Sequence, residues 1–130
     1  MATELGLHRD GRRWNLTEEQ IERRSRVFWV TYVMEVTVAF NYGRPPSIAY
    51  YAIDVPFPRE TPQTVMPIYT MRQRLLQGRV IEELYSFKPN FGPNLNRSAT
   101  VLVELQAELD ALHFALPELY KRANTPYCEE

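Results

Sequence analysis

The sequence predicts an all-α protein, a helical bundle fragment in which a proline-rich extended strap joins the first and second long helices. Two observations carry this prediction. Long apolar segments show helical spacing or length, and five of the ten prolines fall between the first two of these segments. With 130 residues, 45% of them hydrophobic and 24% charged, the chain has the size and composition of one globular domain.

The first predicted helix covers residues 17–40. Thr17 and Gln20 have the spacing of a capping box, in which each side chain satisfies a free backbone N–H of the other residue. The segment 27–40 (VFWVTYVMEVTVAF) is rich in β-branched residues, so a strand is the competing prediction. Its length without Gly or Pro favours a helix. Since the segment is apolar nearly all round, we expect it to be buried among other helices.

The predicted strap covers residues 43–63. Gly43 can adopt the left-handed conformation that ends a helix, and the prolines that follow exclude a regular helix or a central strand. The strap is not a polar linker, and we expect it to pack as an ordered segment. Its apolar residues are Ile48, Tyr50, Tyr51, Ile53, Val55 and Phe57.

Two further helices are predicted, over residues 65–87 and 97–116. Pro67 is tolerated in the first turn of the earlier helix, whereas Gly78 weakens it by about 1 kcal/mol relative to Ala. Pro117 is expected to end the last helix. That helix carries leucines at alternating spacings of three and four residues, which indicates a core-facing stripe or, as an open alternative, a dimer seam. These leucines are Leu102, Leu105, Leu109, Leu112 and Leu116.

Catalytic chemistry is poorly represented. His8 and His113 have no second ligand at metal-binding spacing, and Cys128 lies beside two glutamates, which disfavour a thiolate. A zinc site built on several cysteines is excluded because there is one cysteine. No phosphate-binding glycine loop or nucleophile motif is present, so the sequence predicts neither an enzyme nor a cofactor.

Arginines cluster at the start of the first predicted helix, at positions 23, 24 and 26. A basic cluster can bind phosphate or nucleic acid. However, Glu19 lies four residues before Arg23, a spacing that favours an ion pair on one helix face. Glu22 has the same relation to Arg26, and the net charge of the chain is −1. A salt-bridged helix surface is therefore the favoured interpretation.

Four motifs in order resemble one family. Residues 5–10 read LGLHRD, 22–29 read ERRSRVFW, 43–48 read GRPPSI, and 53–58 read IDVPFP. Together they are similar to the fungal-specific transcription factor domain, the regulatory middle region of fungal zinc-cluster regulators. The chain departs from the family pattern in carrying Ser25 in place of a usual Arg and Leu112 in place of a Trp.

The resemblance implies structural roles for the motif residues. Arg23 or Arg26 would pair with Glu35, Asp54 or a strap carbonyl, which makes these arginines structural. It also implies that residues 1–130 form a partial domain, and that the missing helices would cover residues 27–40. Without them, we expect the chain either to self-associate or to be marginally stable. The motif residues are Arg23, Arg24, Arg26, Phe28, Trp29, Gly43, Arg44, Pro45, Pro46, Asp54 and Pro56.

The function that the resemblance implies is transcription regulation in the nucleus by a segment that does not itself contact DNA. It would act through an effector or through homo- or hetero-oligomeric contacts with related regulators, without a membrane partner. Zinc would belong only to a DNA-binding region absent from this chain. The alternatives are a stand-alone interaction module or a truncated remnant. A small-molecule-binding protein or enzyme is less favoured, and its pocket would use Tyr32, Tyr42, Tyr50 and Tyr51.

Overall fold

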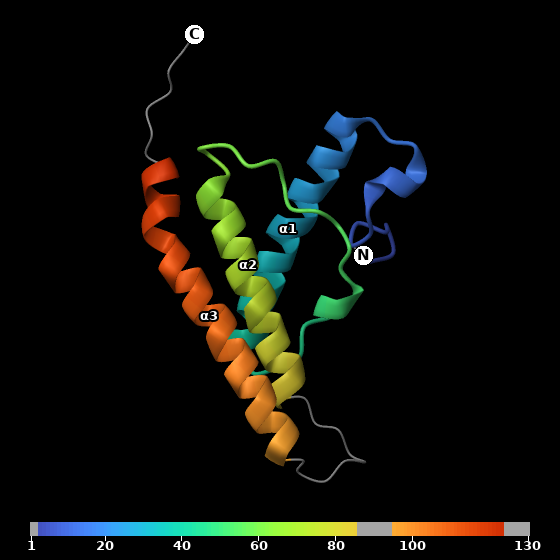
Figure 1. The fold of residues 1–130 in the computed structure, drawn as a ribbon. Helices are drawn as coiled ribbons and strands as arrows, with labels where there is room; N and C mark the ends of the chain where they lie inside the picture. Colours follow the sequence, from blue (N-terminus) through green and yellow to red (C-terminus); the bar gives the residue numbers. More distant parts are fainter. Residues whose placement is uncertain (1–2, 86–94, 124–130) are drawn as a thin grey trace.

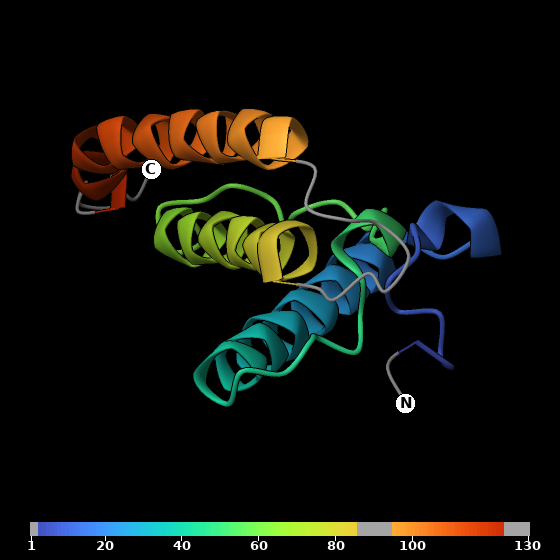
Figure 2. The same cartoon turned by 90° about the horizontal axis from the view of Figure 1, so that it is seen from below.

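The computed structural model describes residues 3–85 and 95–123, and these residues form an all-α structure without strands, as predicted. Two long helices, α1 and α3, lie on either side of α2 (Figures 1 and 2). A long connection from α1 to α2 runs along the side of this stack. The elements in chain order are η1 (Gly11–Trp14), α1 (Glu18–Asn41), η2 (Tyr50–Ala52), α2 (Val65–Val80), η3 (Ile81–Tyr85) and α3 (Leu95–Ala123).

Helix α1 begins and ends with the predicted signals. Thr17 accepts a hydrogen bond from the backbone N–H of Gln20, and the Gln20 side chain accepts one from the backbone N–H of Thr17. After the last turn, Gly43 has φ of 63°, and the Arg44 N–H bonds to the carbonyl of Ala39. The strand alternative for residues 27–40 is wrong, because the capped helix runs through them without a break.

The core is built around aromatic residues of α1. Phe28, Trp29 and Tyr32 are fully buried or nearly so, and their rings contact one another at centroid distances of 5.3 to 6.0 Å. Phe57 of the strap stacks on Trp29 at 4.5 Å. The other buried residues of this core are Val36, Ile48, Val55, Ile68 and Met71.

Hydrogen bonds to α1 hold the strap in place. Ser25 Oγ and Trp29 Nε1 both donate to the carbonyl of Pro56, at 2.6 and 3.0 Å. Further along the helix, the Glu35 carboxylate accepts bonds from the backbone N–H and the hydroxyl of Ser47. The prolines leave strap carbonyls without helical partners, and side chains of α1 supply donors to one of them.

Helix α2 meets α1 at a glycine. A Cβ added at Gly78 would lie 2.5 Å from the hydroxyl of Tyr32, so a side chain at this position would collide with a residue of the core. The glycine that weakens α2 locally therefore permits its close approach to α1. Beyond Val80 the backbone continues as the π-helical segment η3, so α2 ends before the predicted limit at residue 87, and residues 86 and 87 lie outside the described residues.

Helix α3 extends further than its sequence predicts. It continues through Pro117 to Ala123, so the predicted end near residue 116 is wrong. Pro117 removes one backbone donor, but the residue is exposed, and solvent can satisfy the carbonyl that loses its partner. The predicted start at residue 97 lies two residues inside the helix, which begins at Leu95.

Candidate interaction surface

One face of α1 is apolar and uncovered. Its four apolar side chains are 40–65% exposed, and at 100° per residue they lie opposite the buried residues Phe28, Tyr32 and Val36. The expectation that this helix is buried on all sides is therefore wrong, because α2 and the strap cover only one side of it. We call this surface the α1 outer face, and define it by Val27, Val30, Thr31, Met34 and Val38.

The arginines of α1 do not make the predicted contacts with Glu35, Asp54 or the strap. Arg23 pairs with Glu19 at 3.2 Å, as its helical spacing indicates. Arg26 pairs with Glu22 at 3.0 Å. Because residues four apart lie on the same helix face, these glutamates are held close to the guanidinium groups and pair with them in place of strap residues. The link to the strap is made instead by Glu22, whose carboxylate accepts the backbone N–H of Arg59.

Arg24 has a different role. Its guanidinium donates to the carbonyls of Leu5 and Gly6 and lies over the ring of Trp14, 5.2 Å from the centroid. It therefore attaches the N-terminal segment to α1. No signal in the local sequence identifies the carbonyl partners, because they lie 18 and 19 residues away.

Asp54 joins the N-terminal segment to the strap. Its carboxylate accepts the backbone N–H of Asp10 at 2.7 Å and lies within 3.5 Å of the guanidinium groups of Arg9 and Arg13. The Asp54 N–H in turn donates to the carbonyl of His8. Two of the family-like motifs, LGLHRD and IDVPFP, are thus in direct contact.

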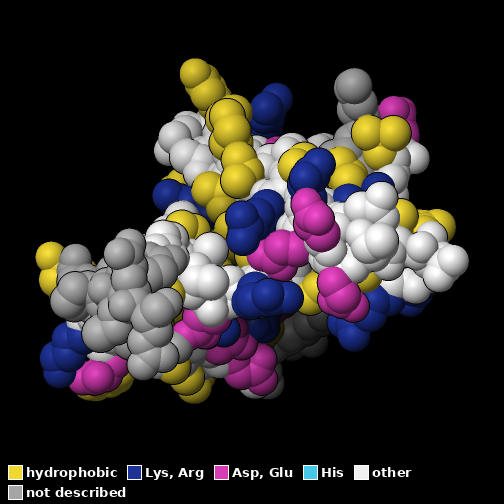
Figure 3. Space-filling view, turned by 90° about the horizontal axis from the view of Figure 1, so that it is seen from above, with side chains coloured by type: hydrophobic (Ala, Val, Ile, Leu, Met, Phe, Trp, Pro, Cys, Tyr) yellow, Lys and Arg dark blue, Asp and Glu magenta, His cyan; other side chains and the backbone are white. Residues whose placement is uncertain are grey.

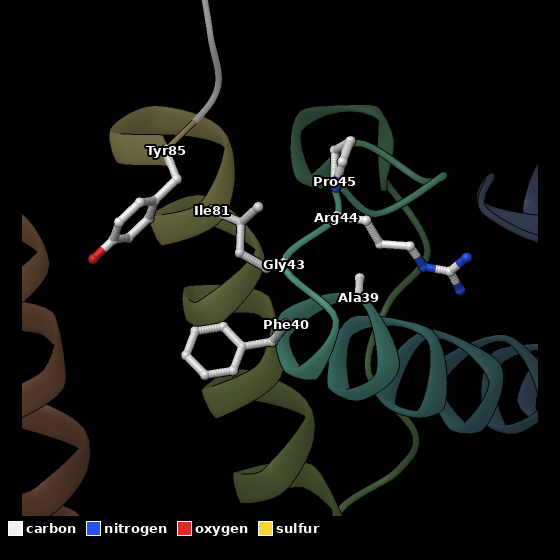
Figure 4. Close-up of a pocket in the computed structure, with 7 residues that line it drawn as sticks. All are labelled: Ala39, Phe40, Gly43, Arg44, Pro45, Ile81 and Tyr85. Atoms are coloured by element: carbon white, nitrogen blue, oxygen red, sulfur yellow. The ribbon is translucent and has the colours of Figure 1, made fainter.

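The remaining motif residues shape the turn after α1. Gly43, Arg44 and Pro45 line a cavity of about 730 Å³ together with residues of α1 and η3. Figure 4 shows the Arg44 guanidinium pointing away from the others, so the cavity is mainly apolar. The other lining residues are Ala39, Phe40, Ile81 and Tyr85.

The leucines of α3 face α2 and differ in burial. Leu105 is 5% exposed, whereas Leu102 is 53% exposed and Leu109 nearly as much. Leu112 is intermediate and lies at a groove formed with Phe57 and α2. Leu116 is also intermediate. Leu105 is therefore a core residue, whereas Leu102, Leu109 and Leu112 border grooves formed with α2.

A network that the sequence analysis missed joins α2, α3 and the strap. Arg79 pairs with Glu83 at 3.3 Å and with Glu108 of α3, and its guanidinium lies over the Tyr50 ring. The hydroxyl of Tyr50 donates to Glu83 at 2.6 Å, and this bond raises the pKa of Tyr50. Of these contacts, only the spacing of Arg79 and Glu83 is visible in the sequence.

Residues 3–85 and 95–123 contain no cluster of three or more His, Cys, Asp or Glu side chains that could hold a metal ion. The four tyrosines of the alternative pocket do not come together, because Tyr32 is buried whereas Tyr42 and Tyr51 are each more than three-quarters exposed. Cys128 lies outside the described residues.

Burial also explains the state of Tyr32. Its hydroxyl has no hydrogen-bond partner among the described residues, and burial, reinforced by Glu82 and Glu35, raises the pKa of this phenol. Tyr32 is therefore protonated at neutral pH and has the environment of a core residue.

Within the described part of the chain, no helix is long and apolar enough to span a membrane.

The fold and its surface define a helical module in which one apolar helix face is exposed and six of the arginines with described side chains pair with carboxylates. Comparison with known families identifies it further. Residues 1–109 match the fungal specific transcription factor domain, so the chain belongs to this family, whose proteins act in transcription regulation. No solved structure matches the chain.

Curated relatives agree with this assignment. An ABC-transporter-regulating transcription factor of Aspergillus fumigatus is 31% identical over 97% of the chain and 16% of its own length. The thiamine repressible genes regulatory protein thi1 of Schizosaccharomyces pombe is 27% identical over 86% of the chain and 16% of its own length. The negative regulator of pleiotropic drug resistance STB5 of Candida glabrata is 26% identical over 87% of the chain and 12% of its own length. The chain thus spans less than one-fifth of the length of these proteins.

Proposed function

We propose that this chain is a regulatory, non-enzymatic segment of a fungal transcription regulator, which acts in the nucleus through protein contacts of the α1 outer face and does not contact DNA. The observation that carries the proposal is the row of exposed apolar side chains on α1, opposite its buried face. Apolar residues exposed together on one helix face are typical of protein–protein contact sites.

The charge distribution supports the absence of DNA contact. Proteins gain affinity for DNA by neutralising phosphates with unpaired basic side chains. Here Arg23 and Arg26 are paired with glutamates of their own helix, and Arg9 and Arg13 lie against Asp54. Figure 3 shows acidic side chains interspersed with the basic ones on one face of the molecule. The net charge of −1 supports the same conclusion.

A reporter assay tests the regulatory role. The chain is fused to a heterologous sequence-specific DNA-binding domain in a fungal host, and reporter output is compared with the DNA-binding domain alone. We expect the fusion to change output and Met34→Glu to remove the change. The control is Phe114→Glu, which alters an apolar side chain that is 82% exposed and belongs to α3, the helix that α2 separates from α1. Equal output from the fusion and the DNA-binding domain alone would contradict the proposal.

Two direct measurements accompany the reporter. Fluorescence anisotropy with a labelled duplex at physiological salt should show no saturation below about 100 µM chain, the weak end of non-specific DNA binding under these conditions. Saturation at low micromolar concentration would refute the absence of DNA contact. A fluorescent fusion to the full-length regulator should accumulate in the nucleus, and exclusion from it would refute the proposed location.

The cavity beside Gly43 supports a second candidate function, response to an apolar effector. Its volume of about 730 Å³ lies within the range of sites for small organic ligands, and Phe40, Ile81 and Tyr85 line it. Anilinonaphthalene sulfonate, an anionic fluorescent probe of apolar sites, should bind more weakly to Tyr85→Ala than to the control Tyr120→Ala. Both tyrosines are well exposed, so neither change should disturb the fold. Equal affinities would exclude this cavity as the probe site.

A further inference from the structure

We infer that a second copy of this chain covers the α1 outer face, in an antiparallel two-fold pair of α1 helices in which Val27 of one copy meets Val38 of the other. The inference deepens the proposed function by naming the partner, and rests on it for the role of this face in protein contacts. It depends on three features: the symmetry of the face, the groups at its two ends, and the area available.

The α1 outer face is symmetric about its own midpoint. Val27 and Val38 are equally distant from the point between residues 32 and 33, and so are Thr31 and Met34. A two-fold axis through this point therefore sets Val27 against Val38 and Thr31 against Met34, in both directions. Val30 would face Glu35, whose carboxylate is already bound by Ser47. Neither central pair brings two charges together, which suits a self-complementary interface.

The same register brings a positive charge to a helix C-terminus. Residue 23 is as far before the midpoint as residue 42 is after it. The exposed guanidinium of Arg23 would therefore lie at the end of the second copy's α1, where the last carbonyls carry partial negative charge. Its present partner, Glu19, is itself largely exposed, so the pair costs little to rearrange.

Each copy also offers an aromatic ring and a hollow to receive it. Tyr42, at the end of α1, is 79% exposed. A hollow of about 330 Å³ lies beside the start of the outer face, on the same side of the helix as Tyr42 at 100° per residue. The antiparallel register places the Tyr42 ring of one copy at the hollow of the other, near the guanidinium group of Arg23, which can stack on it. The hollow is lined by Leu7, Leu16, Gln20, Arg23, Arg24 and Val27.

The exposed area of the α1 outer face limits how stable the dimer can be. The outer face and Tyr42 together would bury on the order of 1,000 Å² across two copies, the lower end for specific interfaces. Interfaces of this size form transient rather than permanent dimers. We therefore expect a reversible dimer whose population rises with protein concentration.

Sedimentation velocity of the full chain over a range of about 1 to 500 µM tests the dimer. The wild-type protein should shift from monomer to dimer with increasing concentration. Met34→Glu, near the two-fold axis, should weaken dimerisation at least tenfold, because it sets a carboxylate in the apolar contact of both copies. Phe114→Glu on the outer side of α3 should leave the Kd unchanged. Circular dichroism of each variant establishes that it is folded.

Disulfide trapping tests the antiparallel register. In a Cys128→Ser background, a mixture of Val27→Cys and Val38→Cys chains should form cross-linked dimers under mild oxidation. Val27→Cys alone should not, because two copies of residue 27 would lie about 16 Å apart along the helices. A disulfide needs Cα atoms within about 7 Å. Efficient cross-linking of Val27→Cys alone would overturn the antiparallel arrangement.

A chain that stays monomeric throughout this range, or a dimer unaffected by Met34→Glu, would overturn the inference. The first outcome would leave the face to a different occupant, such as a helix of a related regulator, and the reporter assay would still test the proposed function. Conversely, a dimer that is lost in Met34→Glu but has no effect on the reporter would sustain the inference while refuting the regulatory role.

Discussion

The contact between Gly78 and Tyr32 makes a sharp prediction about packing of α1 on α2. Replacing Gly by Ala inside a helix ordinarily stabilises it by about 1 kcal/mol. Here the new methyl group would lie 2.5 Å from the Tyr32 hydroxyl, well inside van der Waals contact. Tyr32 is fully buried among Phe28, Trp29 and Val36 and cannot move without disturbing them. Overpacking of this kind costs about 1–3 kcal/mol, so Gly78→Ala should destabilise the protein by about 1 kcal/mol net.

Tyr32→Phe should reverse this effect. The Tyr32 hydroxyl has no partner among the described residues, and an unsatisfied buried hydroxyl costs about 1–3 kcal/mol. Its removal alone should therefore be neutral or stabilising. With the hydroxyl gone, the next ring atom lies 3.7 Å from the added methyl group, an ordinary contact distance. We expect the double variant to be more stable than Gly78→Ala by about 2 kcal/mol or more.

Urea unfolding followed by circular dichroism measures all four proteins of this cycle. Gln73→Ala on the exposed side of α2 is the control and should change the free energy of unfolding by less than about 0.5 kcal/mol. The reasoning would be refuted if Gly78→Ala stabilised the protein, as at an open helix position. It would also be refuted if adding Tyr32→Phe did not raise the free energy of unfolding of the Gly78→Ala variant. An additive cycle would show that the two residues do not contact each other.

Three further predictions follow from single contacts. Ser25→Ala removes one of two hydrogen bonds to the Pro56 carbonyl and should lower the free energy of unfolding by about 1 kcal/mol. Loss of the fold would contradict this, because Trp29 should still hold the carbonyl. Leu105→Ala should cost about 2–3 kcal/mol in urea unfolding and Leu102→Ala less than about 1, and equal costs would contradict the assignment of Leu105 alone to the core. Because the pKa of Tyr32 is raised in the folded protein, this group does not change the free energy of unfolding below the ordinary tyrosine pKa near 10, and lowers it above that pH as the unfolded state ionises. Between about pH 9 and 11, the Tm measured by thermal unfolding should therefore fall less steeply for Tyr32→Phe than for the wild type. Parallel plots of Tm against pH would contradict this.

Local signals in the sequence were sufficient for the helices and for several contacts within them. The Thr17 and Gln20 pair marks the start of α1, and the glutamates four residues before Arg23 and Arg26 identify their partners. These signals succeed because the groups involved are held close by the helix itself. The end of α3 could not be predicted in the same way, since Pro117 is tolerated at an exposed position whose solvation is not a local property.

The sequence by itself determined the all-α class, the limits of α1, the proline-rich strap and the family, because each depends on residues that are neighbours along the chain. Only the tertiary structure decided that Asp54 joins Arg9 and Arg13, that Arg79 links α2 to α3, and that one side of α1 is left uncovered. A uniformly apolar helix carries no periodic signal to distinguish its inner face from its outer face. That choice depends on where α2 and the strap pack, which long-range contacts determine.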